Sequence, residues 1–200
     1  MQIKLAYGKD GLMVDVPDEN LLKVMSMKKM APIEDPYIEL IKALLRPIGL
    51  ETTLFDNART KNSACIVIPD ITRALPNYII LPPILKTLQA AGIPKEKITI
   101  LIATGSHRSN EGDELVELVG EEIVKNYTII NNDSHDYDDH ELVFKSPSGI
   151  DVWIDKRYLD AELKIATGLV EPHFMAGFSG GRKSIVPGIA GYETIKDLHG

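Results

Sequence analysis

The sequence has 200 residues, of which 44% are hydrophobic and 26% are charged, and its formal net charge is −7. This is the composition of a globular domain, and the negative charge argues against nucleic acid or an anionic membrane as the main partner. The single cysteine, Cys65, lies in an apolar run and can form no intramolecular disulfide, which favours a reducing compartment. No signal-peptide core and no apolar stretch of roughly 20 residues is found, so we expect a cytoplasmic protein.

The first sixty residues predict a hairpin followed by a helix. Residues 2–7 and 12–16 alternate as short strands around a glycine-containing turn. Asp35 offers an N-cap, Pro36 suits the first helical position, and an apolar stripe follows until the chain reaches Gly49.

After residue 60, apolar runs alternate with helical segments. The apolar runs span residues 65–69, 97–102, 127–130 and 163–170. Helices are expected over residues 83–91 and 111–119, and an antiparallel insertion over 140–155 with its turn at 147–149. The alternation predicts an α/β fold with a mainly parallel sheet flanked by helices, a small amino-terminal β-hairpin and an antiparallel insertion.

Polar, reactive sequence follows three of the four apolar runs. These segments start at Asp70, Ala103 and Glu171. Ligands of open α/β sheets bind beyond the carboxyl ends of the strands. The sequence therefore predicts a functional site where these three segments meet.

The first two segments each carry a candidate residue with an alternative, purely structural interpretation. Arg73 can hold a carboxylate or phosphate through its guanidinium, but taken alone the pattern favours the structural interpretation, in which Asp70 caps the next helix and Arg73 pairs with Asp70 at the surface. His107 suits general acid–base chemistry near neutral pH, and it can equally be a turn histidine bonded to backbone.

The third segment, residues 171–188, is rich in glycine. Gly177, Gly180 and Gly181 allow a backbone to approach a ligand closely, and their amides can cradle an anion. Lys183 is then either a phosphate clamp or a covalent anchor, and a tight turn with a solvated lysine is the weaker alternative. The segment nearly matches a P-loop, but Arg182 replaces the glycine that should precede the lysine.

Two further features carry weaker signals. His199 near the end of the sequence is a potential metal ligand, although spacing alone makes it an exposed histidine. The acidic run over residues 132–140 contains oxygen ligands for a hard cation, but it lacks the spacing and glycine of a calcium loop, which favours a solvated loop.

Together, these motifs resemble the nickel-dependent lactate racemase family. The motifs are Asp70-Ile-Thr-Arg73, Ala103-Thr-Gly-Ser-His107-Arg108, Pro172-His173-Phe-Met-Ala-Gly-Phe-Ser-Gly-Gly-Arg-Lys183-Ser-Ile-Val-Pro-Gly188 and His199. The resemblance runs along essentially the whole chain and concerns the family's amino-terminal domain. It implies that residues 1–200 form a cofactor-binding domain with residues 1–60 as a β/α extension, and that the family's carboxyl-terminal substrate domain is absent.

The resemblance also implies a cofactor and residue roles. The cofactor is a nickel pincer nucleotide, the pyridinium-3,5-bisthiocarboxylic acid mononucleotide of nickel, which holds the metal through sulfur and a ring carbon. By position, the resemblance implies that His107 and His173 are the acid–base catalysts and that Arg73 orients the substrate. It implies that His199 ligates nickel. The implied cofactor-binding residues are Lys183, Asp70, Ser179, Gly180 and Gly181.

The implied function is that of an isomerase, a racemase or epimerase of small 2-hydroxy acids such as lactate that uses reversible hydride transfer. The implied partners are the substrate and the cofactor-synthesis enzymes, and the 200-residue chain alone is expected to be inactive. Two alternatives remain open: a nucleotide-binding phosphotransferase that uses the glycine-rich turn, and a non-catalytic cofactor- or nickel-binding domain.

Overall fold

The structure is a computed structural model. It describes every residue except Lys9, Met27, Lys29 and Gly200, and it does not describe the side chain of His199. Its internal contacts divide the chain into two units, Met1–Glu34 and Asp35–Gly200. In the first unit, strands β1 (Gln2–Leu5) and β2 (Leu12–Asp15) pair in antiparallel fashion, followed by a short 3-10 helix, η1 (Asp18–Asn20). The predicted hairpin is thus confirmed, while Lys9 of its predicted turn lies outside the described residues.

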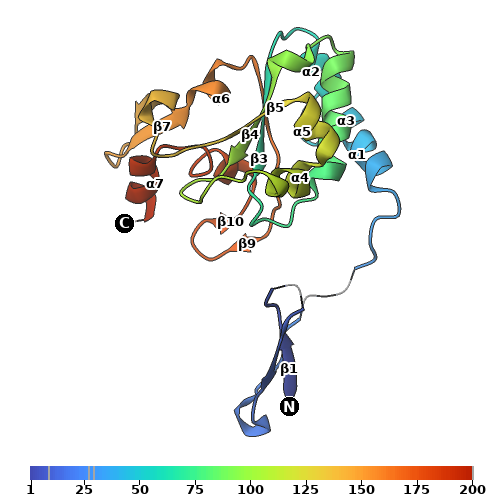
Figure 1. Cartoon of the computed structure of the whole chain (residues 1–200), viewed down its shortest axis with the longest axis vertical. Coiled ribbons are helices and arrows are strands. Elements are labelled where there is room, and N and C mark those ends of the chain that lie inside the picture. Colours follow the sequence, from blue (N-terminus) through green and yellow to red (C-terminus); the bar gives the residue numbers. More distant parts are fainter. Residues whose placement is uncertain (9, 27, 29, 200) are drawn as a thin grey trace. The chain divides into compact units, whose positions relative to one another are not determined.

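A four-stranded parallel sheet forms the centre of the second unit (Figure 1). Its strands are β3 (Ala64–Pro69), β4 (Ile98–Ala103), β5 (Thr128–Asn131) and β8 (Leu163–Ala166). They lie in the order β5-β4-β3-β8, and all three neighbouring pairs are parallel. The predicted parallel sheet is confirmed. Strand β8 ends at Ala166, earlier than the apolar run over residues 163–170 that predicted it.

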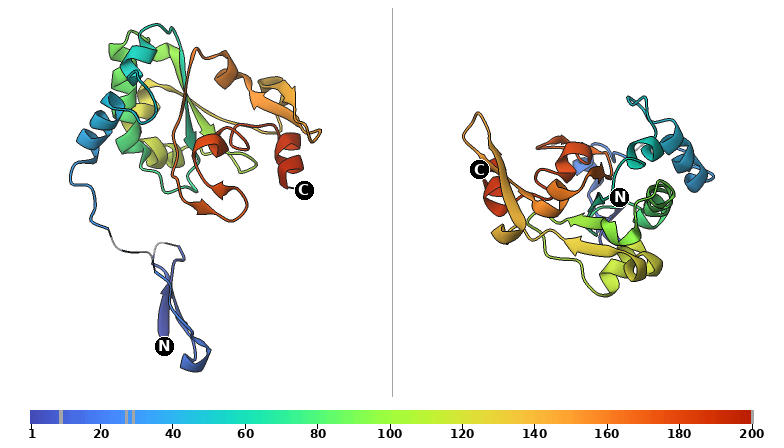
Figure 2. Two further views of the ribbon diagram at one scale, coloured as in Figure 1. Left: turned by 180° about the vertical axis from the view of Figure 1, so that it is seen from behind. Right: turned by 90° about the horizontal axis from the view of Figure 1, so that it is seen from above.

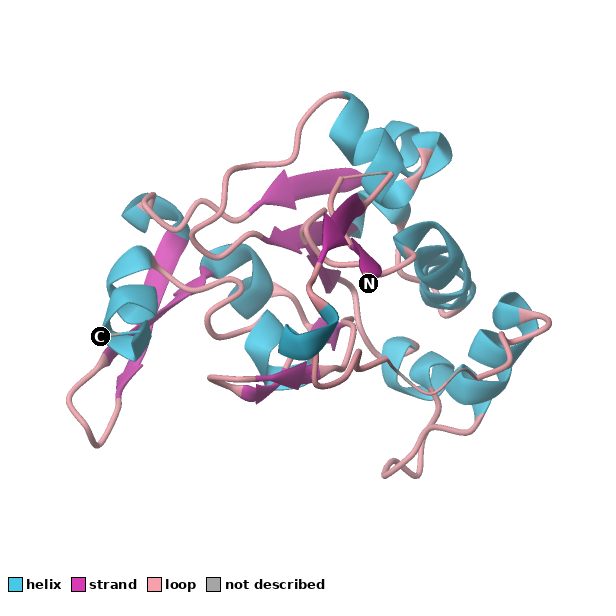
Figure 3. Cartoon of the chain, turned by 90° about the horizontal axis from the view of Figure 1, so that it is seen from below, coloured by secondary structure: helices cyan, strands magenta, loops and turns pink. Residues whose placement is uncertain are grey.

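Both faces of the sheet are covered, which explains why the strands are nearly continuous apolar runs. Alternate residues point to opposite faces: Ile66 and Ile68 enter one apolar cluster, and Cys65 and Val67 enter the other. The first face is covered by α1 (Pro36–Leu45), α2 (Leu54–Ala58), α3 (Asn77–Ala90), α4 (Asp113–Val119) and α5 (Glu121–Asn126). The second is covered by the hairpin of β6 (His140–Lys145) and β7 (Asp151–Asp155), by α6 (Lys156–Asp160) and by α7 (Tyr192–His199). Figures 2 and 3 show these two groups on opposite sides of the sheet.

The helix boundaries follow local capping where it is present. Asp35 caps α1 as predicted, its Oδ1 accepting a hydrogen bond from the amide of Ile38 at 3.0 Å. Helix α2 was not predicted, although Thr53 and Asp56 form the reciprocal capping box that marks its start. Helix α3 begins at Asn77 rather than near residue 83.

The early start of α3 is explained by burial. Pro82 and Pro83 lie inside the helix and lack the amide protons that a helix interior uses. The helix nevertheless continues through them because its apolar side chains fill the core against the sheet. Leu81, Leu85 and Leu88 are almost completely buried, and the burial of each such side chain contributes about 1.5–3 kcal/mol.

The strand order creates a crevice at the carboxyl ends of β3 and β8. From β3 the chain continues outward to β4 and β5 on one side, but it returns to β8 on the other side of β3. Loops leaving β3 and β8 therefore diverge, and ligands of open α/β sheets bind at such a point. The chain after β8 forms a small hairpin of β9 (Pro172–His173) and β10 (Gly177–Phe178) and then a 3-10 turn, η4 (Gly181–Ser184).

Candidate functional site

A pocket of about 260 Å³ lies at these strand ends. Loops after β3, β4 and β8 line it, as the polar strand ends predicted. Its lining includes seven of the residues singled out in the sequence: Asp70, Arg73, His107, His173, Ser179, Gly180 and Lys183. Gly181 lines an adjoining pocket that shares His173 and Lys183 with the first.

Asp70 and His107 form a hydrogen-bonded pair in this pocket. Oδ2 of Asp70 lies 2.6 Å from Nδ1 of His107. The Asp70 side chain is buried, whereas that of His107 is half exposed. The second carboxylate oxygen accepts hydrogen bonds from the amide and the hydroxyl of Thr72, at 3.2 and 2.6 Å. Asp70 is thus held by its own loop and orients the imidazole, and the Nε2 atom of His107 is left for a ligand.

The buried Asn110 and the partly buried Asn131 hold the loop that carries Asp70. Oδ1 of Asn110 accepts a hydrogen bond from the amide of Ile71 at 3.1 Å, and the Asn110 amide donates to Oδ1 of Asn131 at 2.8 Å. Asn110 is 2% exposed. These bonds connect the loop after β3 to the end of β5. Sequence reasoning missed Asn110 because a single asparagine in a loop belongs to no motif.

Arg108 pairs with a carboxylate of the protein itself, so it is not a candidate for ligand binding. Its guanidinium forms two hydrogen bonds with the carboxylate of Glu114, at 2.7 and 2.6 Å. Hydrogen bonds from Arg108 and Asn110 lower the pKa of Glu114 to about 2. Arg108 therefore attaches the loop after β4 to the first turn of α4.

Arg73 is the exposed cation of the pocket. It lines the pocket beside Asp70. Among the residues that the structure describes, no carboxylate forms an ion pair with its guanidinium. Its guanidinium is therefore available to an anionic group of a ligand, and its predicted role in orienting a substrate stays a prediction.

Close backbone packing holds the glycine-rich segment against the strand ends. A Cβ atom on Gly188 would lie 2.3 Å from the carbonyl oxygen of Ser184, so no larger residue fits there. Gly180 has a φ of +68°, and a Cβ atom on it would lie 2.9 Å from the carbonyl oxygen of Leu169. The glycines thus allow the turn to close over the pocket.

Ser179 stabilises this turn through hydrogen bonds to the backbone. Its hydroxyl donates to the carbonyl of Leu169 at 2.6 Å and accepts from the amide of Glu171 at 3.0 Å. Its amide also donates to the carbonyl of Glu171 at 2.9 Å. The contribution of Ser179 to the pocket is therefore the shape of the turn.

The same segment does not fold as a P-loop. A P-loop leads from a strand directly into a long helix, and its final hydroxyl binds magnesium. Here the segment forms the β9–β10 hairpin and the four-residue turn η4. The hydroxyl of Ser184 is used within the protein, where it donates to the carbonyl of Thr167 at 3.1 Å.

His173 and Lys183 meet at the mouth of the pocket. Nζ of Lys183 lies 2.7 Å from Nε2 of His173. Nδ1 of His173 accepts hydrogen bonds from the backbone amides of Met175 and Ala176, at 3.2 and 3.1 Å. Withdrawal from water lowers the pKa of Lys183, and the nearby charge of Arg73 lowers it further.

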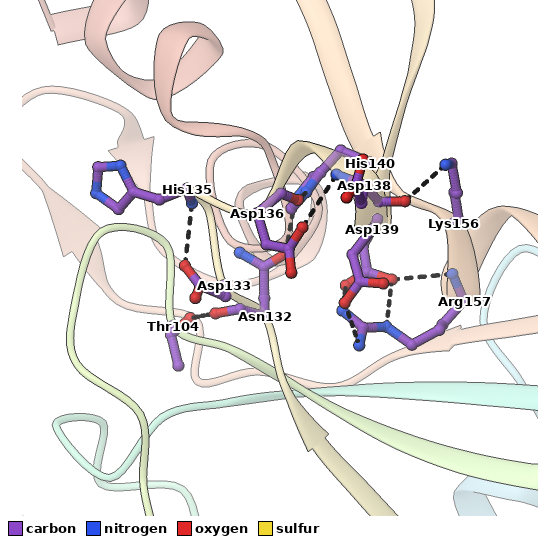
Figure 4. A network of polar contacts seen from close by, with 11 residues as sticks. Thr104, Asn132, Asp133, His135, Asp136, Asp138, Asp139, His140, Lys156 and Arg157 are labelled. Atoms are coloured by element: carbon purple, nitrogen blue, oxygen red, sulfur yellow. Dashed lines mark hydrogen bonds and ion pairs between the residues drawn. The ribbon is translucent and has the colours of Figure 1, made fainter.

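The acidic segment 132–140 is a loop whose Asp133, Asp136 and Asp138 are exposed to solvent, as expected, while hydrogen bonds around the buried His140 hold it together (Figure 4). His140 is 2% exposed, with Nδ1 2.7 Å from the carbonyl of Asp136 and Nε2 3.0 Å from Oδ1 of Asn132. Asp139 forms an ion pair with Arg157 at 2.9 Å. In the described part of the chain, no group of three or more side chains is arranged to bind a metal ion.

The network also holds α7 in place. The hydroxyl of Tyr137 accepts a hydrogen bond from the amide of Glu193 at 2.9 Å, and His135 stacks on Tyr192 at 4.3 Å between ring centres. His199 is the last residue of α7, but its side chain lies outside the described part of the structure, so its predicted role as a nickel ligand stays a prediction.

Comparison with known proteins points to one family. The model of the lactate racemase N-terminal domain matches residues 7–200. The chain is 38% identical over 201 residues to a lactate racemase of Thermoanaerobacterium thermosaccharolyticum, and 40% identical over 203 residues to one of Lactiplantibacillus plantarum. Each alignment covers 98% of this chain and 46% of the relative, so the chain spans about half the length of the curated relatives it matches.

Solved structures show the same fold. The lactate racemase apoprotein from T. thermosaccharolyticum superposes with a TM-score of 0.83 at 38% identity, covering 98% of this chain and 45% of that one. The crystal structure of a protein from Thermotoga maritima superposes with a TM-score of 0.62 at 22% identity, over 82% of this chain and 40% of that one. The second likeness concerns the fold alone.

Proposed function

Because the chain belongs to the family of lactate racemase N-terminal domains, we propose that it forms the cofactor-bearing half of a racemase or epimerase of 2-hydroxy acids such as lactate. The observation that carries this proposal is the presence of two histidines in one pocket at the strand ends. Each is held at Nδ1, His107 by a carboxylate and His173 by two backbone amides.

The chemistry of racemisation explains why two histidines are needed. Removal of a proton from C2 of a 2-hydroxy acid would place negative charge beside a carboxylate, which is unfavourable. If the C2 hydrogen leaves with its electron pair, the hydroxyl must lose its proton, and a planar 2-keto acid results. A histidine on one face takes up this proton, and a histidine on the other face returns one after inversion.

His107 is suited to this task. Because Asp70 binds its Nδ1, Nε2 is the nitrogen that exchanges protons with the substrate, and the carboxylate stabilises the imidazolium that forms. Arg73, in the same pocket, orients the substrate carboxylate. His173 performs the corresponding proton transfer for the opposite enantiomer.

The pocket fits the cofactor that we propose for it, a nickel pincer nucleotide. Gly180 and Gly181 both adopt positive φ angles, +68° and +53°, and successive backbone amides in such turns can bind an anion such as a nucleotide phosphate. Lys183 would hold the cofactor and His199 would ligate its nickel. When bound, this cofactor supplies the group that takes up the C2 hydrogen with its electron pair and returns it.

We propose further that dedicated synthesis enzymes supply the cofactor and that the protein acts in the cytoplasm. The buried free thiol of Cys65 suits a reducing compartment. In the described part of the chain, no helix is long and apolar enough to cross a membrane.

The test uses the protein extended to the full length of its relatives and loaded with cofactor. Lactate deuterated at C2 is expected to racemise more slowly than unlabelled lactate and to keep most of its label. The variants His107→Gln and His173→Gln should each lose racemisation in both directions, by on the order of 10²–10⁴-fold. His135→Phe, which lies outside the pocket and keeps a ring against Tyr192, is the matched control.

Two outcomes would contradict the proposal. Loss of deuterium to water at the rate of racemisation would show that the C2 hydrogen leaves as a proton. Full activity of the double variant that lacks both His107 and His173 would remove these residues from the mechanism.

A further inference from the structure

The hairpin β9–β10 determines which nitrogen of His173 carries a proton. Nδ1 accepts hydrogen bonds from the amides of Met175 and Ala176, at 3.2 and 3.1 Å. A ring nitrogen that accepts a hydrogen bond has no proton of its own. The neutral imidazole of His173 therefore carries its proton on Nε2, which makes Nε2 a donor.

This donor faces the amine of Lys183 at 2.7 Å. A lysine ammonium group has three donors and no acceptor, so an ammonium at this distance would place two donors against each other. A neutral amine has a lone pair that accepts the Nε2 proton. The contact is therefore satisfied only when Lys183 is a free amine.

The surroundings favour the same protonation state. Withdrawal from water disfavours the ammonium and lowers the pKa of Lys183, and the positive charge of Arg73 lowers it as well. Glu171 acts in the opposite direction but contributes least of the three. No carboxylate forms an ion pair with Lys183 in the part of the chain that the structure describes.

We propose that His173 has a second task, in which its Nε2–H holds Lys183 as a free amine and makes this lysine a nucleophile toward carbonyl carbons. His173 is here a positioning residue that acts through Lys183. The inference decides between the two roles that the sequence left open, because a phosphate clamp needs the ammonium and a covalent anchor needs the amine. It deepens the proposed function, since it concerns how that pocket binds an acyl or carbonyl compound.

The reaction with a simple acyl donor shows the chemistry. With acetic anhydride, the nitrogen lone pair of Lys183 forms the new C–N bond, and acetate leaves with the electron pair of the broken C–O bond. The proton that the nitrogen loses passes to water. An ammonium cannot start this sequence because its nitrogen has no lone pair.

The experiment is trace labelling with acetic anhydride between pH 6 and 9, with the rate at each lysine read by mass spectrometry. At pH 7, Lys183 is expected to react several-fold faster than Lys125, which is more exposed but pairs with Glu121 at 2.6 Å. His173→Phe keeps a ring and removes the donor, so it should bring the rate at Lys183 down several-fold. His135→Phe is the matched control and should leave that rate unchanged.

A second measurement needs no variant. Long-range ¹H–¹⁵N spectra distinguish the two histidine tautomers, and His173 is expected to show the proton on Nε2 at neutral pH. A proton on Nδ1, a rate at Lys183 no higher than that at Lys125, or an unchanged rate in His173→Phe would each overturn the inference. None of these readouts involves nickel or turnover, so a racemase without a reactive Lys183 would refute this inference alone.

Discussion

Asp70 and His107 come from the ends of neighbouring strands, and their side chains meet at 2.6 Å although they are 37 residues apart in the sequence. The carboxylate is buried and the imidazole is half exposed. This combination holds one ring nitrogen inside the protein and presents the other to the pocket, which is the arrangement that a general base requires.

Replacement of Asp70 by Asn tests this pair. The amide keeps the size of the side chain but removes the charge that orients and stabilises the His107 imidazolium. We expect kcat for racemisation by the full-length, cofactor-loaded protein to fall by on the order of 10²–10⁴-fold, with KM changed much less. Thr72→Val, which removes one donor to Asp70, should have a smaller effect. An unchanged kcat in Asp70→Asn would mean that the pair is only structural.

His199→Ala tests the predicted nickel ligand. In the full-length protein loaded with cofactor, the substitution should cause loss of nickel on desalting, measured by elemental analysis. Lys196→Ala is the control, because Lys196 lies on the same helix, is exposed and pairs with Glu193 at 3.3 Å. Equal nickel content in His199→Ala and the unaltered protein would refute the assignment.

The Arg108–Glu114 pair should make stability depend on pH in a defined window. The pKa of Glu114 is lowered from its ordinary value of 4.5 to about 2. A carboxylate with a depressed pKa stabilises the folded state fully above its unfolded value and loses this effect as the pH falls toward the folded value. The urea midpoint of the unaltered protein should thus exceed that of Glu114→Gln at pH 7, and the difference should shrink below about pH 4.5.

Salt provides the control for this prediction. Both side chains reach the surface, so 1 M NaCl should also reduce the difference between the two proteins at pH 7. A difference that stays constant from pH 7 to pH 3 would show that packing, and not charge, is responsible.

Cys65 should report on global unfolding. It is the single cysteine of the chain, it is fully buried in β3, and burial raises its pKa to about 12. Because the thiolate is the reactive form, a disulfide reagent at pH 8 should label the native protein very slowly and the urea-unfolded protein rapidly. Labelling of the native protein at the unfolded rate would show that the sheet opens far more readily than this packing implies.

The sequence by itself determined the elements whose causes are local. The apolar run that became β3 is buried from Ala64 to Ile68 and ends at Pro69, directly before Asp70, because a strand covered on both faces needs apolar residues throughout. Asp35 and Pro36 predicted the start of α1, and the Pro-Ser-Gly turn predicted the hairpin of β6 and β7. The one long helix with a wrong start, α3, contains two prolines whose local cost is offset by burial against the sheet, and burial is not a local quantity.

Only the tertiary structure decided which polar side chains share a site. Strand order brings Asp70 to His107, whereas Arg108, the neighbour of His107 in the sequence, binds Glu114 at the start of α4. The close packing of Gly188 folds the glycine-rich segment back, and the small hairpin places His173 against Lys183. Side-chain protonation depends on such partners and on distance from water, and both are set by how the loops pack together, which the sequence pattern does not describe.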